Sequence, residues 1–331
     1  MSALVEPANS VAIERAADLL RAGALVAFPT ETVYGLGADA ENPEAVRRIF
    51  AAKGRPADHP VIVHLYDTSQ LAQWTRSVPV SATKLAAAFW PGPLTLILPR
   101  SSRAPDIVTG GQDSVGLRVP SHPVARALLA AFGGAIAAPS ANRFGRISPT
   151  SARHVADDLG GAVALILDGG ACALGIESTI VSFAGEAPVL LRPGAIAVAE
   201  LTRVLGRQPC APDAAAPRAS GSLATHYAPT TPATLVAPEV LHAEVEQLAA
   251  RDEEIAVLAR TVARPVDFDG TWIHAPAGVT AYAHDLYANL RALDAARADA
   301  ILIEAVPKTD AWTAVRDRLS RATLGDIDDR D

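Results

Sequence analysis

The segment Phe28-Pro-Thr-Glu-Thr-Val-Tyr-Gly-Leu-Gly37 directly follows residues 24–27, an apolar run that is typical of a buried strand. Proline and glycine mark the segment as a turn, and the hydroxyl groups of Thr30, Thr32 and Tyr34 crowd it. In α/β proteins, ligands bind where such strands end. The segment therefore predicts an α/β fold with a small-molecule site at the end of this strand.

On both sides of the segment, apolar runs alternate with amphipathic helical patterns. Helices are expected at 11–21, with Ser10 as the cap, and at 44–53, which Asn42-Pro43 opens. The alternation predicts a large, twisted, mixed sheet flanked by helices. Further strands are expected at 60–65, 94–98, 115–119, 135–138, 163–167, 178–183 and 189–191, and further helices at 69–74, 80–89, 123–132 and 150–159.

The composition changes sharply between residues 206 and 232, where five prolines are mixed with alanine, serine and glycine. Such a segment is typical of a linker. Residues 1–205 are therefore expected to form one α/β domain, and residues 233–331 a smaller one without a phosphate-binding glycine fingerprint. Its strands, expected at 233–236, 255–258, 271–274 and 300–305, alternate with helices at 240–250, 282–296 and 311–322, which predicts a Rossmann-like parallel sheet.

Composition limits the class of protein. The chain has 331 residues, half of them apolar, which is enough for two buried cores. Acidic residues outnumber basic ones by 36 to 29, so stable nucleic-acid binding is not expected. Cys172 and Cys210 lie far apart without metal-ligand spacing, which fits a reducing compartment. No leader and no apolar run of the ~18 residues that a membrane span needs is found, so a cytoplasmic protein is expected.

Two polar pairs that follow expected elements are candidates for binding a nucleotide. Lys53 and Arg55 leave the helix at 44–53, and only three of the 29 basic residues are lysine. A mobile ammonium and a planar guanidinium two residues apart can reach the same anion. Ser140 and Asn142 place a hydroxyl and an amide after an apolar run. Taken alone, each pair is also consistent with a solvated helix end or a capping turn.

Several motifs occur in order between Gly23 and Gly194 and together resemble the YrdC/Sua5 family, the threonylcarbamoyl-adenylate synthases. They are Pro29 to Gly37, Lys53-Gly-Arg-Pro56, Pro60 to His64, Trp90-Pro-Gly-Pro-Leu94, Ser114 to Pro120, Ala138 to Asn142, Ser148-Pro-Thr150, Glu177-Ser-Thr-Ile180 and Leu191-Arg-Pro-Gly194. Past the expected linker, His226-Tyr-Ala-Pro229 resembles the segment that marks the two-domain Sua5 type. The resemblance implies a YrdC-like catalytic domain, a linker that acts as a lid, and a Sua5-type C-terminal domain.

The resemblance also implies two groups of site residues. Those that would bind L-threonine are Thr32, His64, Arg118 and Ser178. Those that would bind ATP are Lys53, Arg55, His59, Ser114, Ser140, Asn142, Ser148, Arg192 and Tyr227, of which Lys53, Arg55, Ser140 and Asn142 would carry the catalysis. Arg118 suits the carboxylate of threonine because a guanidinium can pair with it through two hydrogen bonds, and because a cation inside a sheet needs a partner.

The chain departs from the family pattern at two places. His59 stands before Pro60, where the family usually has asparagine or a similar polar residue. Ser220-Gly-Ser-Leu-Ala-Thr225 stands where the family usually has Pro-Gly-Met followed by basic residues. Tyr227 is expected to reach from the linker to the nucleotide, because an aromatic ring can cover it while the hydroxyl makes a hydrogen bond. The alternative is a connector that Tyr227 merely anchors to the second domain.

The implied activity is that of an L-threonylcarbamoyl-adenylate synthase, a nucleotidyltransferase. It would combine L-threonine, bicarbonate and ATP into threonylcarbamoyl-AMP and pyrophosphate, the first step of the t6A modification of tRNA. Mg²⁺ would accompany ATP, and no residue is identified as its ligand. A downstream tRNA-modifying transferase complex would use the product. The alternatives are a carbamoyl transferase that uses carbamoyl phosphate on the same fold, and an RNA-binding module.

Overall fold

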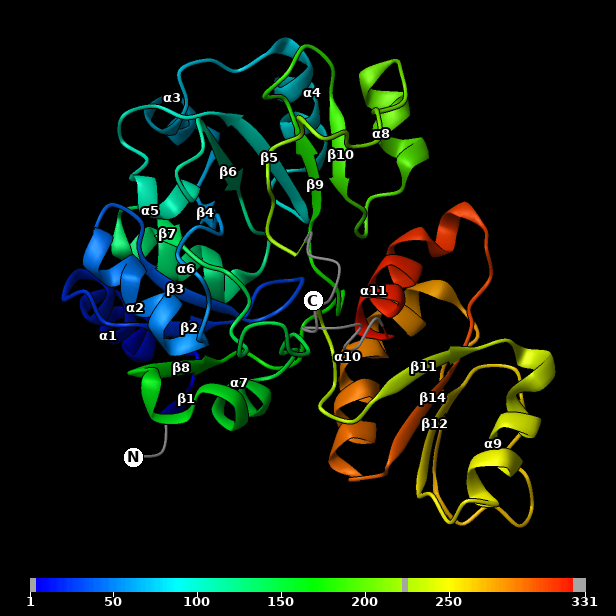
Figure 1. Cartoon of the computed structure of the whole chain (residues 1–331). Coiled ribbons are helices and arrows are strands. Elements are labelled where there is room, and N and C mark those ends of the chain that lie inside the picture. The colour runs from blue at the N-terminus through cyan, green and yellow to red at the C-terminus, as the bar shows by residue number, and fades with distance from the viewer. Residues whose placement is uncertain (1–3, 222–225, 324–331) are drawn as a thin grey trace. The chain divides into compact units, whose positions relative to one another are not determined.

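The computed structural model of the chain describes residues 4–221 and 226–323, which divide into two compact units (Figure 1). The first unit comprises residues 4–144 and 148–221, and the second comprises 145–147 and 226–323. Each unit contains one sheet of its own. The expected α/β class, with a large mixed sheet and a smaller parallel one, is confirmed.

The sheet of the first unit is mixed and has ten strands. They are β1 (Val5–Pro7), β2 (Val26–Phe28), β3 (Gly35–Asp39), β4 (Ile62–His64), β5 (Leu94–Pro99), β6 (Ser114–Arg118), β7 (Ile136–Ala137), β8 (Leu165–Asp168), β9 (Thr179–Ser182) and β10 (Val189–Arg192). Their order in the sheet is β1-β8-β2-β3-β7-β4-β6-β5-β9-β10. The central strands β4 and β6 are parallel, whereas β5 and β6 are antiparallel.

Helices cover both faces of this sheet (Figure 1). They are α1 (Ser10–Arg21), α2 (Pro43–Lys53), α3 (Leu71–Trp74), α4 (Val80–Phe89), α5 (Asp106–Thr109), α6 (Pro123–Phe132), α7 (Ala152–Leu159) and α8 (Val198–Leu205), with 3-10 turns at Thr68–Gln70 and Gly160–Ala162. α1 and α6 pack on one face, and α2, α4, α7 and α8 contribute to the core on the other. Adjacent strand residues such as Val26 and Ala27 therefore enter different cores.

Helix starts follow their capping residues, with one correction to the sequence analysis. Asn42 caps α2 as expected, and Pro43 occupies its first position. α1 is capped by Asn9, whose side chain accepts a hydrogen bond from the Ala12 amide at 2.9 Å, so Ser10 is already helical. Both residue types are good caps, and only the hydrogen bond decides between neighbouring candidates.

The segment 28–37 forms a hairpin rather than a turn alone. β3 begins at Gly35 and pairs antiparallel with β2. Position 37 inside this strand requires glycine, because a Cβ atom there would lie 2.8 Å from the Phe28 ring and 3.0 Å from Ile136. This glycine permits close packing within a strand. The connection between the strands holds Thr30 and Thr32, whose hydroxyl oxygens lie 2.8 Å apart.

The second unit has a parallel four-stranded sheet in the order β11-β14-β12-β13. Its strands are β11 (Ala233–Val236), β12 (Ile255–Ala259), β13 (Thr271–His274) and β14 (Ala300–Glu304), and its helices are α9 (Leu241–Ala249), α10 (Val279–Ala295) and α11 (Thr313–Thr323), with 3-10 turns at Pro238–Val240 and Asp310–Trp312. Within residues 4–221 and 226–323, no helix is long and apolar enough to cross a membrane.

Three residues from the first half of the chain belong to the second unit. The Ala228 amide donates to the Gly145 carbonyl at 2.9 Å, and Arg146 Nη1 donates to the Pro229 carbonyl at 3.0 Å. Arg291 donates to the carbonyl of Ile147. In the sequence, these residues 145–147 lie between Asn142 and Ser148, two residues predicted to bind ATP.

Candidate active site

Arg118 is the last residue of β6 and is buried, with 4% of its surface exposed. Its guanidinium donates hydrogen bonds to Glu31 Oε1 at 2.6 Å, to Thr32 Oγ1 at 3.0 Å and to the Gly92 carbonyl at 3.3 Å. A buried cation requires such compensation. Three segments far apart in the sequence therefore converge on one guanidinium: the β2–β3 connection, the turn before β5 and the end of β6.

His64 ends β4 and lies beside Arg118 in the parallel register of β4 and β6. Because the carboxyl ends of parallel strands meet at one edge of the sheet, the two side chains belong to the same region. Burial, helped by the Arg118 charge, lowers the pKa of His64 to about 3, so its ring is neutral at neutral pH. Its Nδ1 atom is buried and has no hydrogen-bond partner among the described residues. This imidazole can interact with a ligand hydroxyl.

Glu31 is a site residue that the sequence analysis does not identify. Its Oε1 atom pairs with Arg118, and its Oε2 atom accepts a hydrogen bond from the Ser121 amide at 3.1 Å. Burial raises the pKa of Glu31, but the Arg118 charge and the hydrogen bonds outweigh burial and hold the pKa below its usual value. The sequence contains the information needed to identify Glu31, because it is the only acid in the segment 28–37 and the buried Arg118 needs an acidic partner.

Ser178 and Arg192 share one hydrogen-bond network. Arg192 donates to the Ser178 carbonyl from Nε at 3.1 Å and from Nη2 at 3.0 Å, and to Ser178 Oγ at 3.1 Å. The Ser178 hydroxyl in turn lies 2.8 Å from Thr95 Oγ1 on β5. The structure therefore joins a residue predicted to bind threonine to one predicted to bind ATP.

Lys53 connects the two polar pairs of the sequence analysis. Its Nζ atom is buried and donates to the carbonyl oxygens of Ser140 and Asn142, both at 2.5 Å. Gly54 follows with a φ of 62°, a left-handed conformation that glycine adopts readily and that ends α2. Burial, and then the Arg55 charge, lowers the pKa of Lys53 well below 10.5. An incoming anion would raise that pKa again, so this ammonium favours a phosphate ligand.

Arg55 and His59 lie next to Lys53 around an aromatic ring. Arg55 Nη2 donates to the Pro60 carbonyl at 2.7 Å, and its Cζ atom lies 5.9 Å from the centroid of the Phe144 ring. The His59 ring centroid is 5.4 Å from that of Phe144. Burial and the Arg55 charge lower the pKa of His59. His59 thus lies within electrostatic reach of Arg55.

Two buried serines complete the first unit's predicted site residues. Ser148 donates a hydrogen bond to Glu177 Oε1, and Glu177 directly precedes Ser178 in the chain. Glu177 is the second buried acid that the sequence analysis does not identify. Ser114 begins β6 and lies four residues before Arg118, hence on the same face of the strand.

The first part of the expected linker lies on the first unit. The Arg218 amide donates to Gln112 Oε1 at 2.7 Å, and Arg192 Nη1 donates to the Ser220 carbonyl at 2.7 Å. Ala219 is buried in a small apolar cluster with Ile97, Ile180 and Leu191. The linker thus contacts Arg192 directly. Residues 222–225, the last four of the segment 220–225 that departs from the expected linker pattern, lie outside the described residues.

Tyr227 belongs to the second unit and is buried there, with a φ of 64°. Its ring stacks on Tyr287, with ring centroids 5.5 Å apart and an interplanar angle of 29°. The Arg318 Cζ atom lies 5.3 Å from the centroid of the Tyr227 ring. Tyr227 is therefore described only within the second unit, and its contact with ATP stays a prediction.

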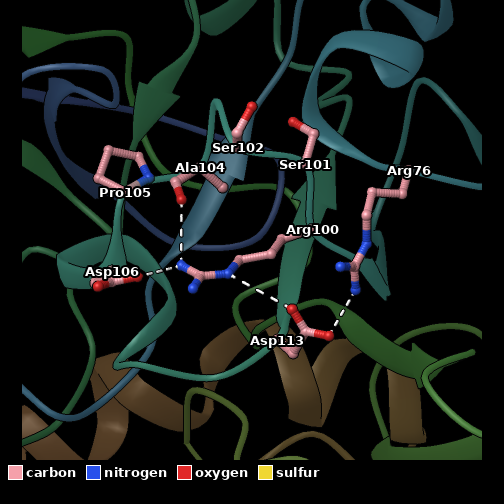
Figure 2. A pocket seen from close by; sticks show the side chains of 8 residues that line it. All are labelled: Arg76, Arg100, Ser101, Ser102, Ala104, Pro105, Asp106 and Asp113. Carbon is pink, nitrogen blue, oxygen red and sulfur yellow. Dashed lines mark hydrogen bonds and ion pairs between the residues drawn. The ribbon is translucent and has the colours of Figure 1, made fainter.

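A surface pocket of about 680 Å³ on the first unit contains none of the predicted site residues (Figure 2). Both of its arginines face carboxylates: Arg76 lies 2.5 Å from Asp113, and Arg100 lies 2.5 Å from Asp106. The two acids are 75% and 81% exposed, so these are surface ion pairs, unlike the buried pair of Arg118 and Glu31. The residues that line it are Arg76, Arg100, Ser101, Ser102, Ala104, Pro105, Asp106 and Asp113.

Two family models match adjoining parts of the chain. The model Sua5_yciO_yrdC, described as "Telomere recombination", matches residues 18–194. The model described as "Threonylcarbamoyl-AMP synthase, C-terminal domain" matches residues 196–323. Together the two matches cover most of both structural units.

Proteins of similar length show the same relationship. The chain is 41% identical to the threonylcarbamoyl-AMP synthase of Bacillus subtilis over 329 residues, which cover 96% of this chain and 95% of that protein. It is also 41% identical to the Pyrococcus abyssi protein of that name over 321 residues, 94% of each chain. A crystal structure of P. abyssi Sua5 complexed with L-threonine matches with a TM-score of 0.88, at 38% identity over 97% of both chains. The chain therefore belongs to the two-domain Sua5 branch of the YrdC/Sua5 family, the threonylcarbamoyl-AMP synthases.

Proposed function

We propose that this chain is an enzyme that forms threonylcarbamoyl-AMP and pyrophosphate from L-threonine, bicarbonate and ATP. The observation that carries the proposal is the buried guanidinium of Arg118 at the carboxyl edge of β6, bonded to Glu31 and Thr32. The similar P. abyssi protein was crystallised with L-threonine. A guanidinium and a hydroxyl are suitable partners for the carboxylate of this amino acid.

The threonine subsite is proposed around Arg118, Thr32, His64 and Ser178. Arg118 would bind the carboxylate, and the neutral imidazole of His64 would interact with the side-chain hydroxyl. Ser178 would complete the subsite because its hydroxyl, bonded to Thr95, lies in the network that includes Arg192. A buried neutral imidazole and a hydroxyl favour threonine over an apolar amino acid, because an apolar ligand would leave them unpaired.

The ATP subsite is proposed at the end of α2. Lys53 and Arg55 would neutralise the phosphates, one as a point charge and the other as a planar fork. Burial, and then the nearby Arg55 charge, lower the pKa of Lys53, which makes an added anion favourable. The other groups of this subsite would come from His59, Ser114, Ser140, Asn142, Ser148, Arg192 and Tyr227.

The proposed chemistry needs no side-chain nucleophile. Carboxylation of the threonine amino group gives a carbamate, and a carbamate oxygen then attacks the α-phosphorus in line while pyrophosphate leaves. In such a displacement, most of the rate enhancement comes from positioning the reactants and neutralising the charge of the phosphates. The Lys53 ammonium is held by two carbonyl oxygens. Such fixed donors stabilise developing charge with little reorganisation.

A magnesium ion is proposed to enter with ATP. Among residues 4–221 and 226–323, no group of three or more His, Cys, Asp or Glu side chains is arranged to hold a metal ion. Mg²⁺ commonly binds through substrate phosphates and water with few protein ligands, and the contacts of Lys53 and Arg55 do not depend on it.

The linker is proposed to cover the occupied site. Its first part already contacts Arg192 through the Ser220 carbonyl. A closed linker would exclude water and protect the mixed anhydride of threonylcarbamoyl-AMP from hydrolysis. Tyr227→Ala is expected to increase the loss of this intermediate, measured as AMP formed per pyrophosphate. An unchanged ratio would leave the second unit with a role outside catalysis.

The product is proposed to serve the t6A modification of tRNA through a separate transferase complex in the cytoplasm. Threonylcarbamoyl-AMP is an activated acyl donor, so a further enzyme must pass its threonylcarbamoyl group to an acceptor. The names of the relatives do not favour a carbamoyl transferase that uses carbamoyl phosphate. An RNA-binding module is disfavoured by the net charge of -7.

The direct test of the proposal is pyrophosphate release from ATP. Release is expected only when L-threonine and bicarbonate are both present, because without the carbamate nothing attacks the α-phosphorus. Carbamoyl phosphate in place of bicarbonate should not support turnover. Equal release without threonine would contradict the proposal, and turnover with carbamoyl phosphate would support the carbamoyl transferase instead.

A further inference from the structure

Glu31 and Arg118 form a buried pair of opposite charges at the proposed threonine subsite. The N–O distance between them is 2.6 Å, and their side chains are 9% and 5% exposed. Glu31 Oε1 accepts a hydrogen bond from Arg118, and Oε2 accepts one from the Ser121 amide. A carboxylate oxygen has two lone pairs, so each keeps capacity for a further donor.

The pair matches the charges of a free amino acid. In L-threonine the ammonium and the carboxylate are attached to the same carbon atom, so a receptor for both must present an anion and a cation side by side. Binding only the carboxylate would give Arg118 two acidic partners and leave the site with an excess negative charge. Binding the zwitterion leaves the charge of the pair unchanged, which avoids that penalty in a buried site.

We infer that Glu31 binds the ammonium group of L-threonine while Arg118 binds the carboxylate. This inference rests on the proposed function and assigns a role to a residue outside the predicted site. It also explains why an acid lies beside Arg118: without ligand, Glu31 compensates the buried guanidinium, and with ligand, it selects amino acids over other carboxylates.

Glu31 does not act as the base in carboxylation. The reaction converts the ammonium and bicarbonate into the carbamate, one water molecule and one proton. The nitrogen loses two protons: one joins the departing hydroxide to form the water molecule, and the other is released to solvent. Its Arg118 partner and hydrogen bonds hold the pKa of Glu31 below its usual value, which makes it a poor proton acceptor. Glu31 therefore contributes to binding of the amino acid and not to the chemical step, and removing its charge should raise KM for threonine without lowering kcat.

The experiment compares two ligands and three proteins. Glu31→Gln removes the charge at nearly constant size, and Glu14→Gln makes the same chemical change at an exposed position of α1 as the matched control. The ligands are L-threonine and 2,3-dihydroxybutanoate, in which a hydroxyl replaces the ammonium. Binding is measured by calorimetry, and KM and kcat by pyrophosphate release.

Glu31→Gln is expected to weaken L-threonine binding by about 10- to 100-fold, the effect of losing a charge-assisted contact. Binding of 2,3-dihydroxybutanoate should stay within about threefold or improve, because a nearby negative charge is lost. Equal weakening of both ligands would overturn the inference, because Glu31 would then act only by orienting Arg118. Unchanged threonine binding would also overturn it.

Two controls separate this inference from folding and from the proposed function. Glu31→Asp, which keeps the charge on a shorter side chain, should recover part of the lost threonine affinity, whereas a purely structural defect would not be rescued by charge. If the wild-type protein fails to bind L-threonine at all, the proposed function fails. If the wild-type protein binds it and Glu31→Gln weakens both ligands equally, or leaves threonine binding unchanged, only the role of Glu31 fails.

Discussion

The two ends of β6 present the same chemical groups in opposite settings. Asp113, directly before the strand, pairs with Arg76 at the surface, where their side chains are 75% and 56% exposed (Figure 2). Arg118, the last residue of the strand, pairs with Glu31, and their side chains are 5% and 9% exposed. The N–O distances are nearly equal, 2.5 and 2.6 Å. Contact geometry therefore does not separate a candidate site from a surface ion pair, whereas burial does.

The physical difference between the two pairs lies in desolvation. An exposed pair is screened by water and salt and contributes about 0–1 kcal/mol. A buried pair must first lose the hydration of two ions, and its net contribution to stability is often no better than that of apolar residues. The fold gains little from placing Arg118 and Glu31 inside the protein, which favours a ligand as the reason for the pair.

The largest expected effect is on stability when one partner of each pair is removed. Arg118→Ala should lower the free energy of unfolding by about 3–5 kcal/mol, because it leaves the Glu31 charge buried without its cation. Arg76→Ala should lower it by less than about 1 kcal/mol. Urea unfolding measures both. The double variant Arg118→Met with Glu31→Gln should recover most of the stability lost in Arg118→Ala. If Arg118→Ala and Arg76→Ala lowered stability equally, the proposed difference between the buried and the exposed pair would be wrong.

Arg55 is a second buried arginine, and we predict that it binds ATP and not L-threonine. Arg55→Ala should weaken ATP binding by about 10- to 150-fold, the equivalent of about 1.5–3 kcal/mol for a charge-assisted contact. L-Threonine binding should change by less than about threefold. Calorimetric titrations of both substrates measure this. If Arg55→Ala affected threonine more than ATP, the two proposed subsites would have to be exchanged.

His64, beside Arg118, should give the buried end of β6 a pH dependence. Its pKa is about 3 in the folded protein, against 6.5 for an unperturbed histidine. Between these values the unfolded chain binds a proton that the folded protein does not, so stability falls as the pH is lowered, by at most ~1.4 kcal/mol per pH unit. His64→Asn should reduce the loss between pH 6 and pH 5 by about 1 kcal/mol in urea unfolding. If the unfolding free energies of the wild type and His64→Asn changed equally with pH, His64 would not be the source of this pH dependence.

The smallest effect is expected at the exposed end. Asp113→Asn should change the free energy of unfolding by less than about 1 kcal/mol, and the difference should shrink at high salt because exposed charges are screened. Pyrophosphate release should be unaffected. A clear loss of turnover would show that the pocket in Figure 2 takes part in the reaction.

Local sequence patterns were sufficient for the elements and for part of the site. Alternating apolar runs predicted both sheets, and Arg118 stood out because a cation in a strand needs a partner. The resemblance to the YrdC/Sua5 family supplied the residues to inspect. The pattern could not show that Gly35 and Gly37 belong to a strand, because the close approach of Phe28 arises only in the folded hairpin.

The partners of the predicted residues could not be read from the sequence. Glu31 and Arg118 are 87 positions apart, and Ser148 and Glu177 are 29 apart. Such pairs depend on strand order, which periodicity does not specify. The same holds for residues 145–147, which lie between two predicted ATP-binding residues but are bonded to the second unit.

The most direct measurement of the central claim is the affinity for L-threonine of two conservative variants, Arg118→Lys and Arg100→Lys. Each keeps the positive charge and removes the planar fork that pairs with a carboxylate. Calorimetric titration should show at least about tenfold weaker binding by Arg118→Lys and wild-type affinity for Arg100→Lys. Equal affinities in the two variants would contradict the claim that the buried end of β6 is the threonine site.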